Sequence, residues 1–388
     1  MAEKSVNVAL IGSKFMGETH SNAYLKVARY FKDLPVKPVM HTLAARNPEE
    51  TRAFAEVWGW QNHTTDWKSA ATNPEIDLVD VSTPNDLHAE QAIAALEAGK
   101  HVACEKPLAG TLDDARQMVE AAKKAASGGQ KTFVWYNYRR TPAVAYAHQL
   151  VKQGRLGRIY HVRAAYLQDW GGPETPLVWR FQGDTAGSGA HGDLNAHIID
   201  MARFITGDEI AEVTGAIEKT FIKQRPLPDD PSKTGESTVD DAVLFLAQFT
   251  QGAVASFEAT RLSTGDKNGN RIEIHGEKGA VRFHFERMNE LQWYDNTLES
   301  GLHGWNTINV TQIDGSHPYF DHWWKPGHII GYEHGFINEA ADIMYVLGDK
   351  APIVPIPDFA DAFETQKVLH AALESARNRC PVSLSEIK

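Results

Sequence analysis

The sequence predicts a doubly wound parallel α/β sheet followed by an α+β domain built on an open antiparallel sheet. Short apolar runs alternate with amphipathic helical stretches through roughly the first third of the chain, a rhythm typical of parallel sheets with helical crossovers. From Ile159 onward, strands joined by glycine turns replace that rhythm. The length of 388 residues and a hydrophobic content of 42% suit two packed domains.

The first strand, Val6 to Ile11, runs directly into a glycine turn and a helix that begins near Glu18. This order of strand, turn and helix places a pyrophosphate on backbone N–H groups at the start of a helix. Gly12 and Gly17 supply two of the expected glycines, whereas Lys14 stands where the dinucleotide pattern has a third. A side chain there would crowd the approach to phosphate unless it points away.

The second strand, Val39 to Ala44, ends in Ala45 and Arg46. An acidic residue at this strand end usually accepts hydrogen bonds from the adenosine ribose, and Ala45 replaces it. Arg46 could pair with a 2′-phosphate, which favours NADP, or stack flat on adenine and accept NAD. A solvated arginine after a strand is the third interpretation.

Two further strands, Leu78 to Ser82 and His101 to Cys104, complete the predicted pattern. The second ends on Glu105, Lys106 and Pro107, and open α/β sheets bind ligands at the carboxyl ends of their strands. Because the proline disfavours a helical conformation at Lys106, we expect this lysine to leave the strand extended and to point into a cleft. It is either a proton-transfer group or an ordinary surface lysine.

Gly128 and Gly129 form the first small-residue break after the alternating half. We therefore expect a dinucleotide-binding Rossmann domain over residues 1–128 and a substrate-binding and oligomerisation domain over residues 129–388. In the second domain, Ile272 and Ile274 alternate with polar residues, which gives the sheet one apolar face. We expect helices to cover that face. The other face is free to pair with a second subunit, which predicts a homodimer or homotetramer.

His191, Asp193 and His197 cluster after a glycine-rich segment. Asp193 and His197 are four residues apart, so on a helix they share one face, and a histidine beside a carboxylate is a tunable acid or base. The three could instead ligate a metal. We favour the interpretation without a bound metal ion, since the other usual signatures of metal sites are absent.

Residues 317–334 are rich in aromatic residues, histidine and glycine. This composition suggests a long loop over a pocket, in which rings cover the apolar face of a sugar and polar groups such as His334 bind its hydroxyls. The competing interpretation is an aromatic loop packed for stability.

A net charge of −11 and a pI near 5.9 do not support a broad basic surface for nucleic acid or anionic lipid. Two cysteines, Cys104 and Cys380, are too few for a disulfide framework or a cysteine-based zinc module. We see no secretion signal and no apolar run that would span a membrane. These features predict a cytoplasmic protein without nucleic-acid or membrane partners.

Four features together resemble the Gfo/Idh/MocA oxidoreductases: the glycine turn, residues 105–107, residues 137–140 and the pattern of Gly192, Asp193, His197 and Asp200. Residues 168–170, 179–181, 186–189 and 258–261 make the chain most similar to sugar and glycoside dehydrogenases of the levoglucosan dehydrogenase type. The resemblance implies that Lys106, Asp193 and His197 are the catalytic residues and that nicotinamide lies over the end of the Lys106 strand. Lys14 and Ala45 depart from the family pattern.

The implied reaction is hydride transfer between a sugar ring carbon, C3, and nicotinamide, with NAD favoured over NADP. The alternative is an NAD-dependent glycosidase that works by transient C3 oxidation, elimination, water addition and re-reduction, with His191, His322, His328 and His334 as candidate bases. The expected cofactor-binding residues are Gly12, Lys14, Phe15, Met16, Gly17, Ala45, Arg46, Ser82, Thr83, Pro84, Asn85, His88, Glu105 and Lys106. The expected substrate-binding residues are Asn137, Arg139, Asp169, Trp170, Trp179, Arg180, His191, Asp193, His197 and His334.

Overall fold

The computed structural model describes residues 4–313 and 315–387, which form two compact units. The first unit contains the chain up to Arg140 together with Tyr319–Lys325 and Ile330–Phe363, and the second contains the rest. The change of unit after Arg140 comes later than the break that we expected at residues 128 and 129. The reason is that strand β6 (Thr132–Val134) pairs with β5 (His101–Cys104) and completes the parallel sheet of the first unit.

The first unit contains a six-stranded parallel sheet in the order β3-β2-β1-β4-β5-β6. Chain order reverses direction between β1 and β4, and such a switch point is where open α/β sheets bind ligands. The predicted doubly wound sheet is therefore confirmed. Its other strands are β1 (Ser5–Ile11), β2 (Lys37–Ala44), β3 (Asn62–Thr64) and β4 (Leu78–Val81).

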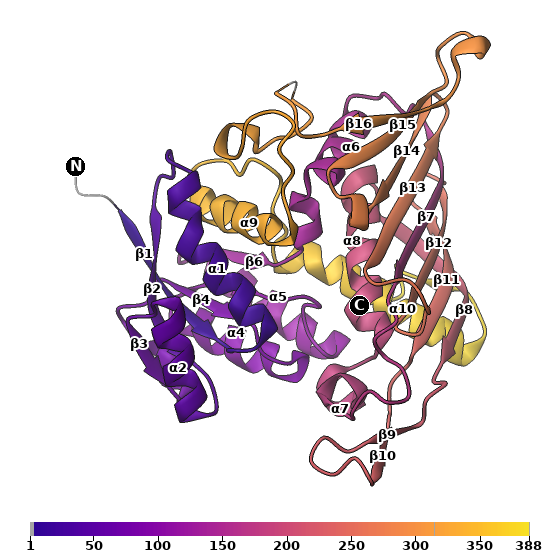
Figure 1. Cartoon of the computed structure of the whole chain (residues 1–388). Helices are drawn as coiled ribbons and strands as arrows, with labels where there is room; N and C mark the ends of the chain where they lie inside the picture. The colour runs from indigo at the N-terminus through magenta and orange to yellow at the C-terminus, as the bar shows by residue number, and fades with distance from the viewer. Residues whose placement is uncertain (1–3, 314, 388) are drawn as a thin grey trace. The chain divides into compact units, whose positions relative to one another are not determined.

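Capping residues fix where several helices of this unit begin. Asn47 precedes α2 and accepts hydrogen bonds from the backbone N–H groups of Glu49 and Glu50, and Thr111 caps α5 in the same way. The helices of the alternating part are α1 (Phe15–Tyr30), α2 (Pro48–Trp58), α3 (Trp67–Thr72), α4 (His88–Glu97) and α5 (Leu112–Ala126). A sixth, α9 (Tyr332–Leu347), comes from much later in the chain and packs along α1 (Figure 1).

The second unit is built on a nine-stranded sheet in the order β16-β15-β14-β13-β7-β12-β11-β8-β17. One pair departs from the antiparallel pattern that we expected: β7 (Ile159–Leu167) and β12 (Val254–Thr260) run parallel. The chain builds two other strands of this sheet, β8 and β11, before it returns beside β7, so the sheet is mixed. The remaining strands are β8 (Ile210–Lys219), β11 (Ala242–Phe249), β13 (Gly269–Gly276), β14 (Gly279–His284), β15 (Glu290–Asp295), β16 (Trp305–Asn309) and β17 (Val382–Ser383), and β9 (Gln224–Pro226) pairs with β10 (Thr234–Glu236).

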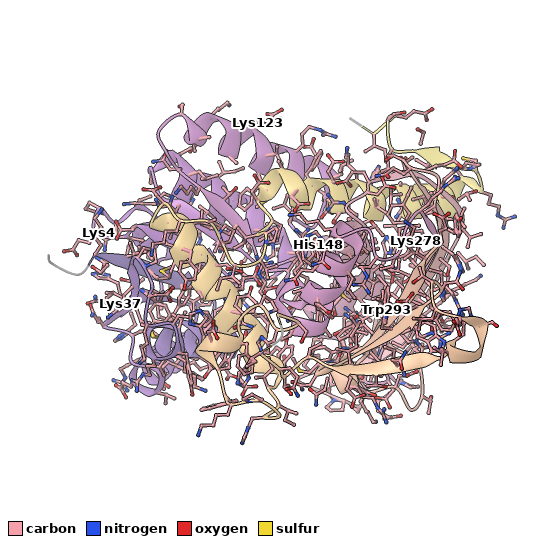
Figure 2. The ribbon with its side chains drawn as sticks, turned by 90° about the horizontal axis from the view of Figure 1, so that it is seen from above. Lys4, Lys37, Lys123, His148, Lys278 and Trp293 are labelled. Atoms are coloured by element: carbon pink, nitrogen blue, oxygen red, sulfur yellow. The ribbon has the colours of Figure 1, made fainter. Side chains whose placement is uncertain are left out.

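Helices cover one face of this sheet (Figure 1). They are α6 (Pro142–Lys152), α8 (Ala196–Thr206) and the part of α10 (Phe359–Asn378) that follows Phe363, while the short α7 (Gly183–Ala186) lies near β9 and β10. His148 of α6, labelled in Figure 2, stacks on Phe204 of α8 with ring centroids 4.4 Å apart. Among the described residues, no helix is both long and apolar enough to cross a membrane.

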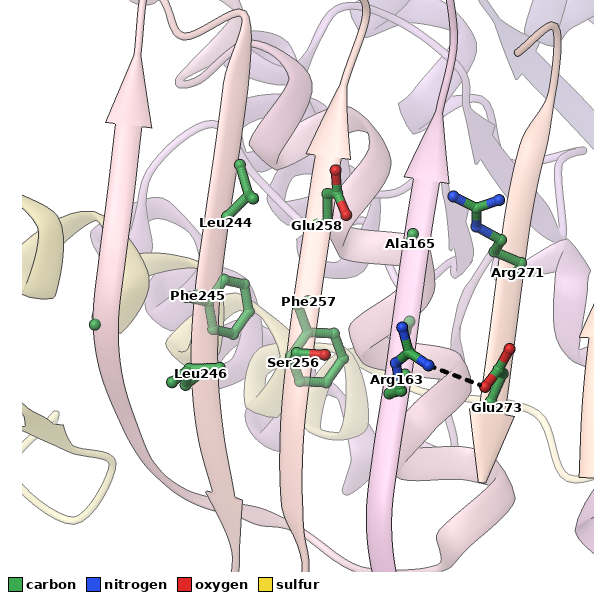
Figure 3. Close-up of a pocket in the computed structure, with 12 residues that line it drawn as sticks. Arg163, Ala165, Leu244, Phe245, Leu246, Ser256, Phe257, Glu258, Arg271 and Glu273 are labelled. Carbon is green, nitrogen blue, oxygen red and sulfur yellow. Dashed lines mark ion pairs between the residues drawn. The ribbon is translucent and has the colours of Figure 1, made fainter. Parts of the chain in front are cut away.

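The opposite face of the sheet carries exposed apolar side chains. Along β11 buried and exposed positions alternate, and Leu244 and Leu246 are 39% and 52% exposed. Figure 3 shows Leu244 beside Glu258 and Leu246 beside Ser256, with Arg163 and Glu273 forming an ion pair of 3.5 Å across neighbouring strands. The predicted one-sided helical cover of the sheet is thus confirmed.

Candidate active site

The turn after β1 has the backbone geometry that a dinucleotide pyrophosphate requires. Gly12 has φ of +120°, and a Cβ at this position would lie 2.5 Å from Ser82 Oγ. A Cβ on Gly17 would clash with the carbonyl oxygen of Gly12, so both glycines allow the turn and α1 to pack closely. No side chain caps the start of α1, where Phe15, Met16 and Gly17 form the first turn. These residues fit an anion on the helix N-terminus.

The backbone conformation at Lys14 does not require a glycine. Its φ of −97° and ψ of −162° are extended backbone that any residue adopts. Its Nζ donates to Glu50 Oε2 at 2.6 Å on α2, and the side chain is 83% exposed. The departure from the glycine pattern is therefore accommodated by a side chain that turns toward α2.

The exits of β2 and β4 carry the next expected cofactor residues. Ala45 is half-buried and Arg46 is exposed after β2, while Ser82 and Thr83 follow β4. Ser82 Oγ donates to the carbonyl oxygen of Ile11 at 3.1 Å, which ties this exit to β1. Pro84 and Asn85 continue the exit into a single turn ahead of α4.

His88, another expected cofactor residue, begins α4. Its ring is fully buried, with Nε2 2.9 Å from the carbonyl oxygen of Thr83 and Nδ1 3.1 Å from that of Pro107. Burial lowers the pKa of His88. The ring joins the loops that follow β4 and β5, and a contact with the cofactor stays a prediction.

Lys106 is half-buried directly after β5, and its backbone N–H donates to Glu105 Oε2 at 3.1 Å. The other oxygen of Glu105, Oε1, lies 3.0 Å from His20 Nε2. The predicted strand exit therefore exists, and the carboxylate before the lysine is locked into the interior of the first unit.

His20 of α1 lies between two buried carboxylates. Its Nδ1 is 3.0 Å from Asp80 Oδ2, and the same carboxylate accepts from Tyr24 at 2.9 Å and from Trp135 Nε1 at 3.0 Å. Burial by itself would lower the pKa of His20, but the charges and hydrogen bonds of Asp80 and Glu105 outweigh it and raise the pKa to about 10. The ring is thus an imidazolium at neutral pH.

A second buried group of charges lies on α9. Glu339 is fully buried and neither carboxyl oxygen has a hydrogen-bond partner among the described residues, so burial raises its pKa to about 8. Asp342 is equally buried, and burial raises its pKa to about 6 although Arg140 lies 3.3 Å away and opposes the shift. Glu339 is therefore predominantly protonated at neutral pH.

Three expected substrate residues lie in the first unit, and two of them, Asn137 and Arg139, are only 4% exposed. Arg139 Nη1 donates to Asp361 Oδ2 at 2.9 Å. This ion pair fixes the arginine within the first unit, and a contact with substrate stays a prediction for both residues.

In the second unit, Asp240 organises the segment that carries the expected catalytic residues. Its carboxylate accepts from the backbone N–H of Gly189 at 2.7 Å and of His191 at 2.9 Å. A Cβ on Gly189 would clash with the carbonyl oxygen of Asp240, which explains the glycine. Residues His191–Asn195 then form a π-helical turn ahead of α8, a feature that is frequent at functional sites.

His191 lies at the start of the π-helical turn. Its ring is fully buried, Nε2 lies 2.8 Å from the carbonyl oxygen of Leu369, and Nδ1 lies 2.8 Å from Asn195 Nδ2. Burial lowers the pKa of His191. Both nitrogens are occupied, which favours a structural role, and a contact with substrate stays a prediction.

Asp193 lies in the π-helical turn with a side chain that is 25% exposed, and its Oδ2 accepts from Arg261 Nη2 at 2.8 Å. His197 follows in the first turn of α8, is 7% exposed, and its ring lies 5.8 Å from that of Tyr166. The structure thus places both residues in the same helical segment, one in its π-helical start and one in α8.

The remaining expected substrate residues lie between β7 and α7. Asp169 pairs with Lys267 Nζ at 2.6 Å, and this hydrogen bond lowers the pKa of Asp169. Trp170 is 38% exposed, and Trp179 stacks with the guanidinium of Arg180 at 4.4 Å. The structure gathers aromatic and charged side chains in this segment, as the sequence suggested.

The aromatic loop packs mainly for stability in the first unit. Trp323 lies 4.5 Å from the ring of Tyr30 and donates to Asn338 Oδ1, while His322 stacks on Phe31 at 4.1 Å. His334 Nδ1 accepts from the backbone N–H of Gly331 at the start of α9, and its ring lies edge-on to Trp323. These contacts favour the packing interpretation that the sequence left open.

Sequence reasoning did not assign roles to His20, Asp80, Glu339 or Arg261. Asp80 offered a signal, since a carboxylate inside an apolar run of a buried strand needs a partner. Arg261 offered a weaker one through its place directly after a strand. His20 and Glu339 look like polar positions of amphipathic helices, and nothing local distinguishes them.

Comparisons with known proteins cover nearly the whole chain. Residues 6–128 match an oxidoreductase family with an NAD-binding Rossmann fold, and residues 144–282 match a GFO/IDH/MocA C-terminal domain. A levoglucosan dehydrogenase of Pseudarthrobacter phenanthrenivorans is 40% identical, with 99% of each chain covered. A solved oxidoreductase domain protein from Kribbella flavida is 48% identical with a TM-score of 0.93, over 98% of this chain and 99% of that one. A solved levoglucosan dehydrogenase in complex with NADH and levoglucosan is 41% identical with a TM-score of 0.92, over 98% of this chain and 100% of that one.

The buried His20 predicts a pH-dependent stability. Because its pKa rises from 6.5 to about 10 on folding, its contribution is fully present below pH 6.5 and is lost as the pH rises toward 10. We expect the wild type to lose about 3–5 kcal/mol of unfolding free energy over that window. His20→Gln should be less stable at pH 7 and flatter between pH 7 and 10.

Urea unfolding followed by circular dichroism at pH 6.5, 8.0 and 9.5 measures this dependence. His63→Gln, at an exposed position of β3, is the matched control and should keep the wild-type slope. An unchanged slope in His20→Gln would show that His20 is not the group that titrates.

Proposed function

Because this chain belongs to the Gfo/Idh/MocA oxidoreductase family and carries an NAD-binding Rossmann domain, we propose that it oxidises a ring hydroxyl of a sugar or glycoside. The proposed position of oxidation is C3. The observation that carries the proposal is the position of Lys106 at the exit of β5. Glu105 holds the backbone of Lys106, and β5 lies in the same sheet as β1, the strand that leads into the glycine turn. The similar levoglucosan dehydrogenase, solved with NADH and levoglucosan, supports a neutral sugar as substrate.

NAD, when bound, accepts the hydride at nicotinamide C4. In the proposed reaction, Lys106 or His197 takes the proton of the hydroxyl group while Asp193 orients the reacting groups. Glu105 keeps the backbone of Lys106 in place, and Arg261 holds the carboxylate of Asp193. Trp170, Trp179 and Arg180 are proposed to contact the sugar.

We propose NAD over NADP as the physiological cofactor. Arg46, exposed after β2, is the residue that could hold a 2′-phosphate. NAD is favoured because residues 6–128 match an NAD-binding Rossmann family and because the similar levoglucosan dehydrogenase was solved with NADH. A half-buried Ala45 in place of the ribose acid leaves room for either cofactor.

The alternative function, a redox-assisted glycosidase, needs additional histidines as bases. His191 and His334 are engaged with backbone and side-chain groups of their own units, and His322 stacks on Phe31. No observation in the described residues favours elimination chemistry over net oxidation, so the dehydrogenase is the function that the site supports best.

For the oligomer, we propose pairing through the outer face of the nine-stranded sheet. Ile217, Leu246 and Val254 are each more than half exposed there, on three neighbouring strands. Exposed apolar patches of this kind mark protein interfaces. The exposed Cys380 and the buried Cys104 are free thiols, which supports the cytoplasm as the proposed compartment.

Lys106→Ala should keep the fold and the affinity for NADH while it lowers kcat at least about a hundredfold, the scale for removing a positioned proton-transfer group. Turnover and NADH fluorescence titrations measure the two effects separately. Lys68→Ala, an exposed surface lysine, serves as the control and should behave as wild type. Near wild-type turnover of Lys106→Ala would rule out its catalytic role.

Incubation with NAD and a panel of levoglucosan, free hexoses and aryl glycosides tests the net reaction. A dehydrogenase should form free NADH in step with oxidised sugar and release no aglycone. Catalytic release of aglycone at substoichiometric NAD, with deuterium from solvent at C2, would instead establish the glycosidase.

Leu246→Glu should dissociate the proposed oligomer, because it buries a charge in an apolar contact between copies. Light scattering coupled to gel filtration gives the mass of wild type and variant. Val57→Glu, on an exposed position of α2, should leave the mass unchanged. A monomeric wild type, or a Leu246→Glu variant of unchanged mass, would contradict the proposed interface.

A further inference from the structure

Arg261 connects two parts of the second unit that are distant in the sequence. Its Nη2 donates to Asp193 Oδ2 at 2.8 Å, and its Nη1 donates to the carbonyl oxygen of Arg180 at 3.2 Å. One guanidinium therefore touches both the π-helical turn and the segment between Gln168 and Phe181.

The rings of the same segment pack on this guanidinium. Its central carbon lies 4.9 Å from the ring centroid of Trp170 and 5.6 Å from that of Phe181. The backbone adds a third link, since Gly171 N–H donates to the carbonyl oxygen of Arg261 at 3.0 Å, and a Cβ on Gly171 would lie 2.8 Å from Arg261 Cβ. The segment cannot shift without disturbing the arginine.

Burial makes these contacts consequential. Arg261 is only 1% exposed, and its Nε has no hydrogen-bond partner in the part of the chain that the structure describes. A buried guanidinium is stable only with an opposite charge and good geometry, and Asp193 supplies that charge. The position of the arginine and the orientation of the carboxylate therefore depend on each other.

Arg225 offers an internal comparison. It is fully buried, its guanidinium lies 3.6 Å from the ring centroid of Phe181, and it donates to the carbonyl oxygens of Gly171 and Gly172 at 3.0 Å. Its ion pair, however, is with Asp241 at 2.9 Å. Arg225 thus holds the same segment as Arg261, but its carboxylate partner is Asp241 and not Asp193.

We propose that Arg261 is a positioning residue that fixes Asp193 and the segment of Trp170, Trp179 and Arg180 in one common geometry. The inference rests on the proposed function, because it gives these residues their catalytic and substrate-binding roles. A guanidinium is needed, since its planar fork reaches a carboxylate and a carbonyl at once, which the single ammonium of lysine does not reproduce.

The kinetic test compares Arg261→Lys, Arg261→Gln and Arg225→Lys, with levoglucosan and NAD as probes. We expect kcat of both Arg261 variants to fall about a hundredfold, the scale of a misplaced reacting group, with an unchanged KM for NAD. Arg225→Lys should raise the KM for levoglucosan and keep kcat within a few fold. A full kcat in Arg261→Lys, or an equal loss in both lysine variants, would overturn the inference.

The pH profile separates positioning from general loosening. Without its guanidinium partner, the Asp193 carboxylate should take up a proton at a higher pH. The acidic limb of the kcat/KM profile should therefore shift to higher pH in Arg261→Gln. It should stay in place in Arg225→Lys. A limb that moves equally in both would assign the effect to the stability of the segment alone.

Hydrogen exchange provides a readout that does not depend on the substrate. Arg261→Lys and Arg261→Gln should speed exchange in peptides covering residues 168–181 and in those covering 191–197. Arg225→Lys should speed it only in the first. If wild type oxidises no sugar or glycoside of the panel, the proposed function is at fault, while hydrogen exchange still decides the role of Arg261. Unchanged hydrogen exchange at residues 191–197 in both Arg261 variants would overturn the proposed positioning role of Arg261.

Discussion

A charge that folding removes from water must meet an opposite charge, and this requirement shapes the surroundings of the proposed catalytic residues in both units. In the first unit, the imidazolium of His20 is stable because Asp80 and Glu105 flank it. Glu105 in turn holds the backbone of Lys106. In the second unit, the buried guanidinium of Arg261 plays the corresponding part for Asp193. Lys106, through its backbone, and Asp193, through its carboxylate, are thus each held by a partner that is itself buried.

Local features of the sequence were sufficient to predict the parallel sheet, the glycine turn and the exit of Lys106. Strand periodicity and turn chemistry act over a few residues, so they can be read without the fold. The charge pairs could not be found in this way, because His20 and Asp80 are 60 residues apart and Asp193 and Arg261 are 68 apart. Only tertiary folding brings such partners together. The parallel pairing of β7 with β12 was missed for the same reason.

Histidines were the least predictable residues of the candidate site. A neutral imidazole offers one donor and one acceptor, so it suits the ends of helices and the gaps between loops as well as it suits a substrate. His88 joins two loops, His191 holds the start of a helix against Leu369, and His334 caps α9. Spacing along the chain does not reveal these hydrogen bonds, because their partners come together only in the folded protein.

The first unit is discontinuous in the chain, and this has a consequence for synthesis on the ribosome. Arg140 is fully buried beside Asp342 of α9, and α9 packs along α1, yet the whole second unit up to Pro318 is translated between them. A nascent chain that has just completed the parallel sheet lacks the helix that pairs with Arg140 and covers α1. The cofactor-binding unit therefore reaches its final packing only after nearly all of the protein has been made, so the usual order in which an N-terminal domain folds first does not apply to it.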